Sequence, residues 1–291
     1  MPSGSQESRA EVHPYCSETY CSAFKVDPES RLYVPPWRTW IALRGGVAAG
    51  GARRGSGLYP FASLDPACEL VEGLEHLRER SLDSFYMVTD PLWRPPVEAL
   101  RDAFGFCRPL KLAWLIDREK GPVRFRKKHR NRINRCRRRC EARVISLRDH
   151  ADACFALYRR FAAQKQISDF MDVPESCFPV LAGMRQLTTI GVFEGEELVA
   201  FSLWVRFRDA AYFVLGASSA RGYEIAASYA YHASAIEHFN DCRYVLFGPE
   251  TGMVDTPDYP TSGFKSGFAN STAQVWVCGS KLSSLGGRAR S

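Results

Sequence analysis

The sequence lacks any long apolar run. No stretch approaches the roughly 18 consecutive apolar residues that a membrane helix requires, and no basic segment followed by an apolar one marks a signal peptide. We therefore expect a cytoplasmic protein. In that compartment the ten cysteines should be reduced thiols, because disulfides rarely persist there. The cysteines form no CxxC pair and have no suitably spaced histidine, which argues against structural zinc.

Motifs of several enzyme classes are missing too. The six histidines are scattered singly, and neither HxxxH, HExxH nor a Ser/His/Asp or Cys/His arrangement stands out. A metalloenzyme or a triad hydrolase is therefore not favoured. The glycine-rich stretch 45–57 contains neither GxxxxGK[ST] nor GxGxxG between a strand and a helix, and we interpret it as a surface loop. No fixed short repeat indicates a solenoid or a propeller.

Lysine is scarce, and the positive charge is unevenly distributed. The chain has 8 Lys against 31 Arg, a bias that codon usage alone can produce. Residues 124–143 hold eleven Lys or Arg and one Glu, a local charge of +10, whereas the whole chain carries +7. The remainder of the chain therefore sums to −3. The basicity is a local feature of a slightly acidic protein, which points to a polyanionic partner for this segment.

Within the basic segment, Phe125, His129, Ile133, Cys136 and Cys140 follow one another at steps of 4, 4, 3 and 4. That spacing places them on one face of a helix and leaves the other faces almost entirely to Arg and Lys. We interpret the apolar stripe as the docking side and the cationic surface as a phosphate-binding site. The alternative is an ordinary solvated face. The predicted phosphate-binding residues are Arg124, Arg126, Lys127, Lys128, Arg130, Arg132, Arg135, Arg137, Arg138 and Arg139.

The remaining pattern alternates helices with strands and predicts an α/β layer. Helical spacing is found over 67–80, 97–104, 149–164 and 225–240. Short apolar runs predict strands over 40–43, 85–89, 111–117, 188–193, 198–207, 211–215, 244–247 and 274–277. The three strands between 188 and 215 should form an antiparallel meander. The last strand is expected to close the sheet.

These elements, in this order, resemble the acyltransferase domain of Fem-like (FemAB-type) transferases, which belong to the GNAT superfamily and take amino acids from aminoacyl-tRNA. The resemblance covers about residues 84–277. The matching residues lie in the basic helix, the next helix, a glycine hairpin, a Tyr-bearing strand and an FK element: Lys127, Lys128, Arg130, Arg132; Phe155, Leu157, Tyr158; Gly195, Val199, Ala200; Tyr212; Gly248, Gly263, Phe264, Lys265 and Phe268.

The resemblance implies an α/β (α+β) GNAT-like fold, with a mixed, mostly antiparallel sheet flanked by helices. Larger Fem enzymes have two full GNAT-like halves, whereas this chain has room for one full half and a reduced one. We expect a reduced N-terminal α/β half over 1–120 with about 30 loose residues at its start, a GNAT-like acyltransferase domain over 121–280, and a loose tail over 281–291.

One departure concerns the acyl donor. Ordinary GNAT enzymes carry a Q/R-x-x-G-x-G/A loop that binds the pyrophosphate of coenzyme A through free backbone N–H groups at a helix N-terminus. Residues 219–224 (SARGYE) stand in its place here. This departure weakens the case for acetyl-CoA and, by elimination, favours another donor. We therefore expect no cofactor, with aminoacyl-tRNA as co-substrate and a small peptide or other amine as acceptor.

Aminoacyl-tRNA is an activated ester, so an amine can attack it without a protein nucleophile. The enzyme must orient the two substrates, remove a proton and stabilise the oxyanion. Lys265, in the FK element, is the oxyanion candidate, in line with the role that the resemblance implies. The acid–base candidates are Glu250, Asp255, Asp258 and Tyr259, and the predicted substrate pocket is Tyr212, Ser218, Tyr223, Gly248 and Phe264. No metal site is predicted.

Three functions are compatible with the sequence. The first is an aminoacyl-tRNA-dependent transferase that forms a peptide bond on a small peptide or on a cell-wall or natural-product precursor. The second is a GNAT N-acyltransferase that uses acetyl-CoA or a longer acyl-CoA. The third is a non-catalytic GNAT-like module that binds RNA, whose affinity would not depend on Lys265.

Overall fold

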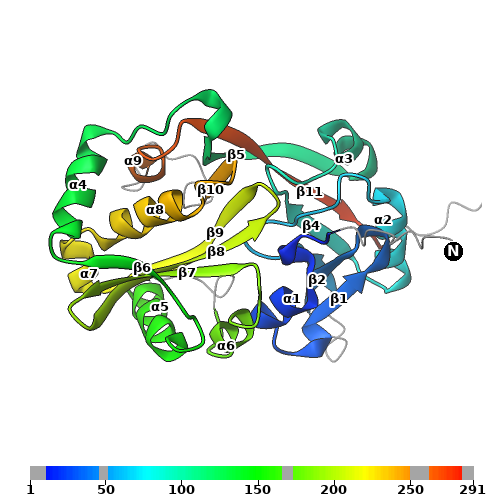
Figure 1. Cartoon of the computed structure of the whole chain (residues 1–291). Helices are drawn as coiled ribbons and strands as arrows, with labels where there is room; N and C mark the ends of the chain where they lie inside the picture. The colour runs from blue at the N-terminus through cyan, green and yellow to red at the C-terminus, as the bar shows by residue number, and fades with distance from the viewer. Residues whose placement is uncertain (1–10, 46–51, 166–172, 250–261, 284–291) are drawn as a thin grey trace, which may run out of the picture.

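A single mixed sheet runs through the protein in the computed structural model, which describes residues 11–45, 52–165, 173–249 and 262–283 (Figure 1). Within this part of the chain the sheet has eleven strands in the order β1-β2-β3-β4-β11-β5-β10-β9-β8-β7-β6. Their bounds are β1 Arg31–Val34, β2 Thr39–Arg44, β3 Arg54–Ser56, β4 Ser84–Val88, β5 Phe106–Asp117, β6 Glu141–Ile145, β7 Leu187–Glu194, β8 Glu197–Phe207, β9 Ala210–Ser218, β10 Tyr244–Pro249 and β11 Ser271–Lys281.

The helices flank this sheet on both faces. The α-helices are α1 Glu18–Phe24, α2 Leu70–Glu79, α3 Val97–Ala103, α4 Lys127–Arg137, α5 Ala151–Lys165, α6 Cys177–Leu181, α7 Ala220–Glu224, α8 Ala227–His238 and α9 Ser262–Lys265. Short 3₁₀ turns are η1 Pro14–Cys16, η2 Pro28–Ser30, η3 Pro35–Trp37 and η5 Arg118–Lys120. No helix in the described ranges combines the length and apolarity needed to cross a bilayer.

Strand β11 joins the two halves of the sheet. Its residues 271–279 pair with β5, and residues 277–281 pair with β4, both antiparallel. The expectation that the last strand closes the sheet is therefore wrong: it lies in the middle, between two strands that the chain forms much earlier. Strand partners are long-range contacts, so the local pattern of β11 could not reveal its position.

The pairing between β9 and β10 is short. The two strands are parallel, and their register covers only Tyr244–Leu246 against Ala210–Tyr212, whereas β9 continues to Ser218. On its other side β10 pairs with β5, and that register shifts between Leu246 and Gly248. Gly248 has a φ of +80°, a conformation that side chains with a Cβ rarely adopt. The sheet is thus irregular at the carboxyl ends of the parallel strands β9 and β10.

Two large cores lie on opposite faces of the sheet in the C-terminal half. One core forms beneath α4 and α8, around buried residues such as Trp204, Ile236 and Phe247. The other forms beneath α1, α5 and α6, around residues such as Phe178 and Phe201. A third core under α2 and α3 serves the N-terminal half. The α4 side and the α5 side of the sheet therefore offer two separate surfaces.

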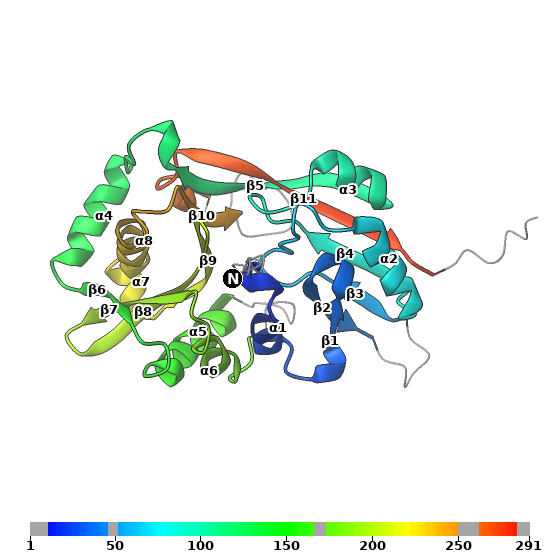
Figure 2. The same ribbon diagram turned by 45° about the vertical axis from the view of Figure 1, so that its right-hand side comes forward.

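The predicted fold class is confirmed, and most predicted helices and strands form close to their expected bounds. The N-terminal segment, which was expected to be loose over about 30 residues, packs against the rest of the protein from His13 onward. Its residues Tyr15, Tyr20 and Cys21 are buried in the core. Figure 2 shows α1 between α6 and strand β2, which it also contacts. Part of the expected glycine-rich loop is strand β3, where Gly55 packs against Leu82 and Phe85. Residues 46–51 lie outside the described residues.

Candidate active site

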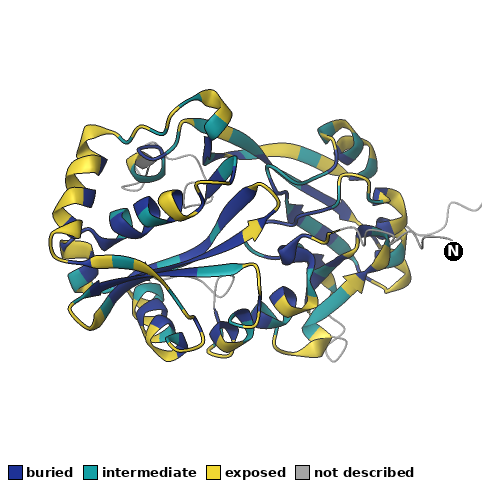
Figure 3. Ribbon diagram, viewed as in Figure 1, coloured by how far each residue is buried: buried dark blue, intermediate teal, exposed yellow. Residues whose placement is uncertain are grey.

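The basic helix forms as predicted, with a shorter extent. Helix α4 buries His129, Ile133 and Cys136, and Figure 3 shows that its outer surface is exposed. All ten predicted phosphate-binding residues are exposed. Arg124 and Arg126 precede the first turn, and the chain leaves the helix after Arg137. The helix thus presents the predicted cationic surface to solvent.

Few acidic groups balance this surface. Among the ten cations, and within the described residues, only Arg137 forms an ion pair, with Glu237 of α8 at 2.7 Å. Arg132 lies over the ring of Tyr229, with 5.1 Å between its Cζ and the ring centroid. Like charges one turn apart repel by a few tenths of a kcal/mol per pair. The helix therefore carries a cost that a bound polyanion would relieve.

An open hollow runs along this surface. It is lined by side chains on one side of α4: Lys127, Lys128, Asn131, Arg132 and Arg135. Four of the five carry a positive charge, and none carries a negative one. The hollow suits the phosphates of an extended backbone, because such contacts need charge and reach rather than a closed pocket.

His129 links this helix to the segment that carries Lys265. Its Nε2 lies 2.8 Å from the carbonyl oxygen of Phe264, in α9. A carbonyl only accepts, so Nε2 carries the proton and donates. The His129 ring packs edge-on against Phe268 and Tyr229, at centroid distances of 4.7 and 5.0 Å. Burial lowers the pKa of His129, and the nearby cations of α4 lower it further, so the imidazole is neutral at pH 7.

Gly267 makes this contact possible. A Cβ at position 267 would lie 1.9 Å from Cε1 of His129, which is far inside van der Waals contact. The Arg126 amide also donates to the Gly267 carbonyl, at 3.3 Å. The start of α4 and the chain around Gly267 therefore fit together only without a side chain at this position.

Lys265 lies at the end of β10. Its Nζ donates a hydrogen bond to the carbonyl oxygen of Pro249, and a Cβ on Gly248 would lie 3.8 Å from that Nζ. Phe264 packs in the same core against Tyr229. The structure thus brings together Gly248, Phe264 and Lys265, which the sequence analysis assigns to one site. They gather where the pairing of β9 with β10 has already ended.

Asn270 fixes the chain between Lys265 and β11. Its Oδ1 accepts from the Asp117 amide at 2.8 Å, and its Nδ2 donates to the Asp117 carbonyl at 3.0 Å. Leu115 of β5 pairs with Ser271 on one side and with Leu246 on the other. Because β11 starts beside β5 at this level, the segment before it is held next to the end of β10. No local sequence pattern indicates this clamp.

The other predicted pocket residues that the structure describes belong to β9 and α7. Tyr212 is buried on the opposite face of β9, where its hydroxyl bonds to the carboxyl of Asp90. Ser218 ends β9, and Tyr223 is 43% exposed on α7. Glu250, Asp255, Asp258 and Tyr259 lie outside the described residues, so their acid–base roles stay predictions.

Three amides of the turn that replaces the coenzyme A loop are hydrogen-bonded within the protein. Ser219 N donates to the Val199 carbonyl at 2.9 Å, Gly222 N to Ser219 Oγ at 3.0 Å, and Tyr223 N to the Ser219 carbonyl at 3.0 Å. A Cβ on Gly222 would lie 2.4 Å from the Val199 oxygen, so the turn is packed tightly against β8. These three amides are not available to a pyrophosphate, which agrees with the departure seen in the sequence.

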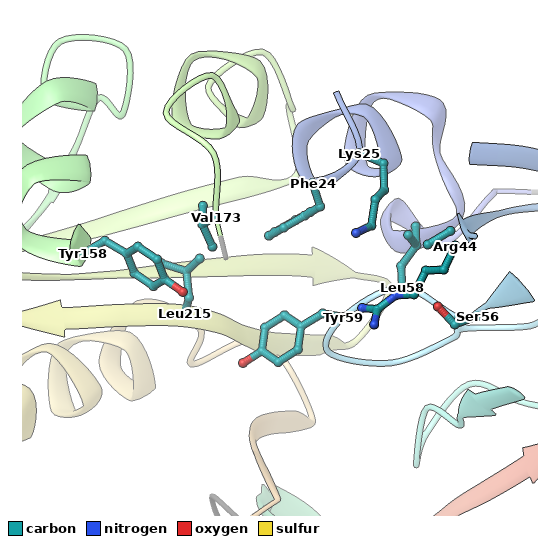
Figure 4. Close-up of a pocket in the computed structure, with 11 residues that line it drawn as sticks. Phe24, Lys25, Arg44, Ser56, Leu58, Tyr59, Tyr158, Val173 and Leu215 are labelled. Atoms are coloured by element: carbon teal, nitrogen blue, oxygen red, sulfur yellow. The ribbon is translucent and has the colours of Figure 1, made fainter. Parts of the chain in front are cut away.

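A second pocket, which the sequence analysis missed, lies on the α1 and α5 side of the sheet (Figure 4). It is a cavity of about 30 Å³ between the two halves of the chain. Lys25 and Arg44 reach it from the N-terminal half, and Tyr158 and Leu215 line it from the C-terminal half. Lysine is rare in this chain, and that rarity drew attention to Lys265. The same reasoning applied to Lys25 could have identified this pocket from the sequence.

Comparisons with known proteins identify the fold. A family model described as an acetyltransferase (GNAT) domain matches residues 127–251. No curated protein matches the chain. Among solved structures, L-PGS from Bacillus licheniformis is similar with a TM-score of 0.58 and 12% identity, over 94% of this chain and 95% of that chain.

Two further structures show the same fold. The C-terminal DUF2156 domain of a protein described as a lysylphosphatidylglycerol synthetase from Agrobacterium fabrum has a TM-score of 0.55 at 13% identity, over 82% of this chain and 79% of that one. FemX has a TM-score of 0.53 at 8% identity, over 82% and 83%. The predicted resemblance to Fem-like proteins of GNAT fold is confirmed. The protein has a GNAT fold, and its residues 127–251 match the acetyltransferase (GNAT) domain model.

Replacing Gly267 should uncouple α4 from the Lys265 segment. We expect Gly267→Ala to lower the free energy of unfolding by about 1–3 kcal/mol, because the His129 ring must move and its hydrogen bond to Phe264 breaks. Urea unfolding measures the change. In the matched variant Gly263→Ala, where a Cβ would meet nothing within 4 Å, the change should stay within about 0.5 kcal/mol. Equal destabilisation of both variants would contradict this view of the contact.

Proposed function

We propose that the protein transfers an amino acid from aminoacyl-tRNA to the amine of a small peptide or of a cell-wall or natural-product precursor, forming a peptide bond. The observation that carries the proposal is the direct link between the cationic surface of α4 and the Lys265 segment, through His129 and Phe264. The surface for the nucleic acid and the charge for the reaction would thus lie on two segments that are in direct contact.

The exposed cations of α4 supply the binding step. Lys and Arg that neutralise phosphates release condensed counterions, so the binding is expected to weaken steeply as salt rises. One Arg guanidinium can also donate two parallel hydrogen bonds to the same phosphate, which favours a defined orientation of the bound backbone. With the tRNA backbone on α4, its acceptor end can extend along the surface towards Lys265.

The chemical step needs little from the protein beyond position and charge. The neutral amine of the acceptor attacks the ester carbonyl carbon and forms the C–N bond. The tetrahedral oxyanion then collapses, the C–O bond breaks, and the ribose hydroxyl leaves with the proton that the amine gives up. The Lys265 ammonium would stabilise the oxyanion. The proton would pass through one of the candidates Glu250, Asp255, Asp258 and Tyr259.

The name of one similar structure supports the proposal that an amino acid is transferred. The name of the Agrobacterium fabrum protein, a lysylphosphatidylglycerol synthetase, describes a product in which lysine is joined to a lipid. The identities of 8–13% to the three structures carry the fold only.

A second candidate is an acyl-CoA-dependent N-acyltransferase. The family model for residues 127–251, an acetyltransferase domain, favours it. The turn 219–224 opposes it, because the amides of Ser219, Gly222 and Tyr223 are already bonded within the protein. Consumption of acetyl-CoA by the purified protein, with no use of charged tRNA, would decide for this alternative.

A transfer assay tests the proposal directly. Purified protein, mixed radiolabelled aminoacyl-tRNAs and a panel of amines should give a labelled product that RNase pretreatment abolishes. Lys265→Ala should lower kcat by about 10²–10³, the effect typical of removing one oxyanion donor. Lys281→Ala, which removes an exposed lysine from the end of β11, should leave the rate unchanged. RNA binding without any product, unaltered by Lys265→Ala, would instead indicate a non-catalytic RNA-binding module.

Charge removal on α4 tests the nucleic-acid surface. In Lys128→Ala/Arg135→Ala, we expect weaker tRNA binding and a salt dependence of log Kd that is shallower by roughly 0.7–0.9 for each phosphate that is no longer neutralised. Arg148→Ala/Arg185→Ala removes the same charge from exposed positions away from α4 and should change neither quantity. Filter binding at several salt concentrations measures both. Identical slopes for the two double variants would remove α4 from the binding site.

A further inference from the structure

We infer that Cys107 and Cys278 form a redox modification site, at which a hydroperoxide such as hydrogen peroxide converts the two thiols into a reversible disulfide. The two residues join β5 to β11, the strand that connects the two halves of the sheet. The disulfide would lock this pairing. The inference goes beyond the proposed function and does not depend on it, because the pair lies near the end of β11 that is farther from the Lys265 segment.

The two sulfur atoms are already in contact. Both residues are free thiols in the structure, and the Cys278 thiol donates to the sulfur of Cys107 at 3.0 Å. A disulfide needs about 2.0 Å between its sulfurs, so a small rotation of the side chains is enough. The two residues are direct partners in the antiparallel ladder. Such partners have Cα atoms roughly 4.5 or 5.5 Å apart, and both spacings lie within the range that disulfides span. The bond can therefore form without movement of the backbone.

The neighbouring residues hold the pair in register. Gly279 pairs with Phe106, and a Cβ on Gly279 would lie 2.7 Å from a ring atom of Phe106, so the ring packs closely over β11. One residue further along, the Gly105 amide donates to Ser280 Oγ at 2.9 Å. Cys278 is also paired with β4 on its other side. The two thiols are thus kept next to each other by the sheet itself.

The two thiols differ in their access to solvent. All ten cysteines lie in the described part of the chain, and among them Cys68 and Cys107 are half-exposed while the other eight are buried. Burial raises the pKa of Cys278, and the adjacent Cys107 raises it further, so Cys278 keeps its proton. An oxidant therefore reaches Cys107 first, and Cys278 stands behind it as the thiol that completes the disulfide.

The reaction balances with the peroxide as the only oxidant. The Cys107 sulfur attacks one oxygen of hydrogen peroxide, the O–O bond breaks, and Cys107 becomes a sulfenic acid. The departing hydroxide takes the proton that the Cys107 thiol gave up and leaves as water. The Cys278 sulfur then attacks the Cys107 sulfur, the S–O bond breaks, and a second water leaves with the Cys278 proton. Each cysteine loses one electron, and the peroxide gains two.

A second pair of cysteines competes for the same role. Cys136 and Cys140 share a hydrogen bond at the end of α4. Both are buried, so neither offers a thiol that an oxidant meets first. Exposure therefore favours Cys107 and Cys278, and identification of the linked peptides separates the two possibilities.

A disulfide at this position would act on the whole molecule. Cys107 and Cys278 are 171 positions apart in the chain, and a cross-link over so long a loop removes many conformations from the unfolded state. The bond would lie where β11 passes from β5 to β4, along the strands that cross between the two halves (Figure 1). Oxidation should therefore stabilise the connection between the halves.

Peptide mapping after peroxide treatment tests the inference. The purified chain is reduced, freed of reductant and treated with hydrogen peroxide, and its remaining thiols are alkylated in denaturant. We expect one cross-linked peptide pair that joins Cys107 to Cys278, so that eight cysteines are alkylated instead of ten. Dithiothreitol should restore all ten. Oxidation should also raise the midpoint of urea unfolding by about 1 M.

Two serine variants make the test specific. Cys107→Ser, at a half-exposed position, should fold normally and should lose both the cross-link and the shift of the urea midpoint. Cys68→Ser removes the other half-exposed thiol and should keep both.

Three results would overturn the inference. One is that peroxide leaves all ten thiols free or carries Cys107 to a sulfinic acid without a cross-link. Another is a cross-link between other cysteines, such as Cys136 and Cys140. The third is a bond between Cys107 and Cys278 that leaves the urea midpoint where it is in the reduced protein, because the bond would then not lock the pairing.

Discussion

The pairing of β11 with both β4 and β5 is the contact on which the rest of the molecule depends. It makes one sheet from two halves of the chain, and it starts at Ser271, directly after the Lys265 segment. Asn270 clamps that start to Asp117. Because β5 also pairs with β10, the lysine is held at the end of β10. The same sheet brings Lys25 and Arg44 of the N-terminal half next to β9.

The cationic side chains gather in two different parts of the molecule. The cations of α4 are exposed and, apart from Arg137, form no ion pair among the described residues, as suits a polyanion that binds and leaves. Two cations of the N-terminal half, the half-buried Lys25 and the exposed Arg44, line a small cavity on the other side of the sheet. The short pairing of β9 with β10 leaves an irregular stretch of the sheet beside Lys265. His129, neutral and buried, joins the first site to Lys265 without adding to the charge of the surface.

Much of this architecture could be predicted from the sequence. The strands β7, β8 and β9 were predictable because their apolar runs are long and buried, and α4 because its stripe recurs at helical spacing. Strand β6 was missed because it is an exposed edge with charged residues. The His129–Phe264 bond spans 135 residues, and the cavity draws on several distant segments, so no local pattern could reveal either.

The central claim is that α4 and the Lys265 segment act as one tRNA-binding unit. Hydrogen–deuterium exchange with and without aminoacyl-tRNA tests it most directly, because exchange slows where backbone amides are covered or stabilised. The account predicts that slower exchange appears together in residues 127–137 and 262–270 when charged tRNA is added. Slower exchange in α4 alone, or in neither segment, would contradict it.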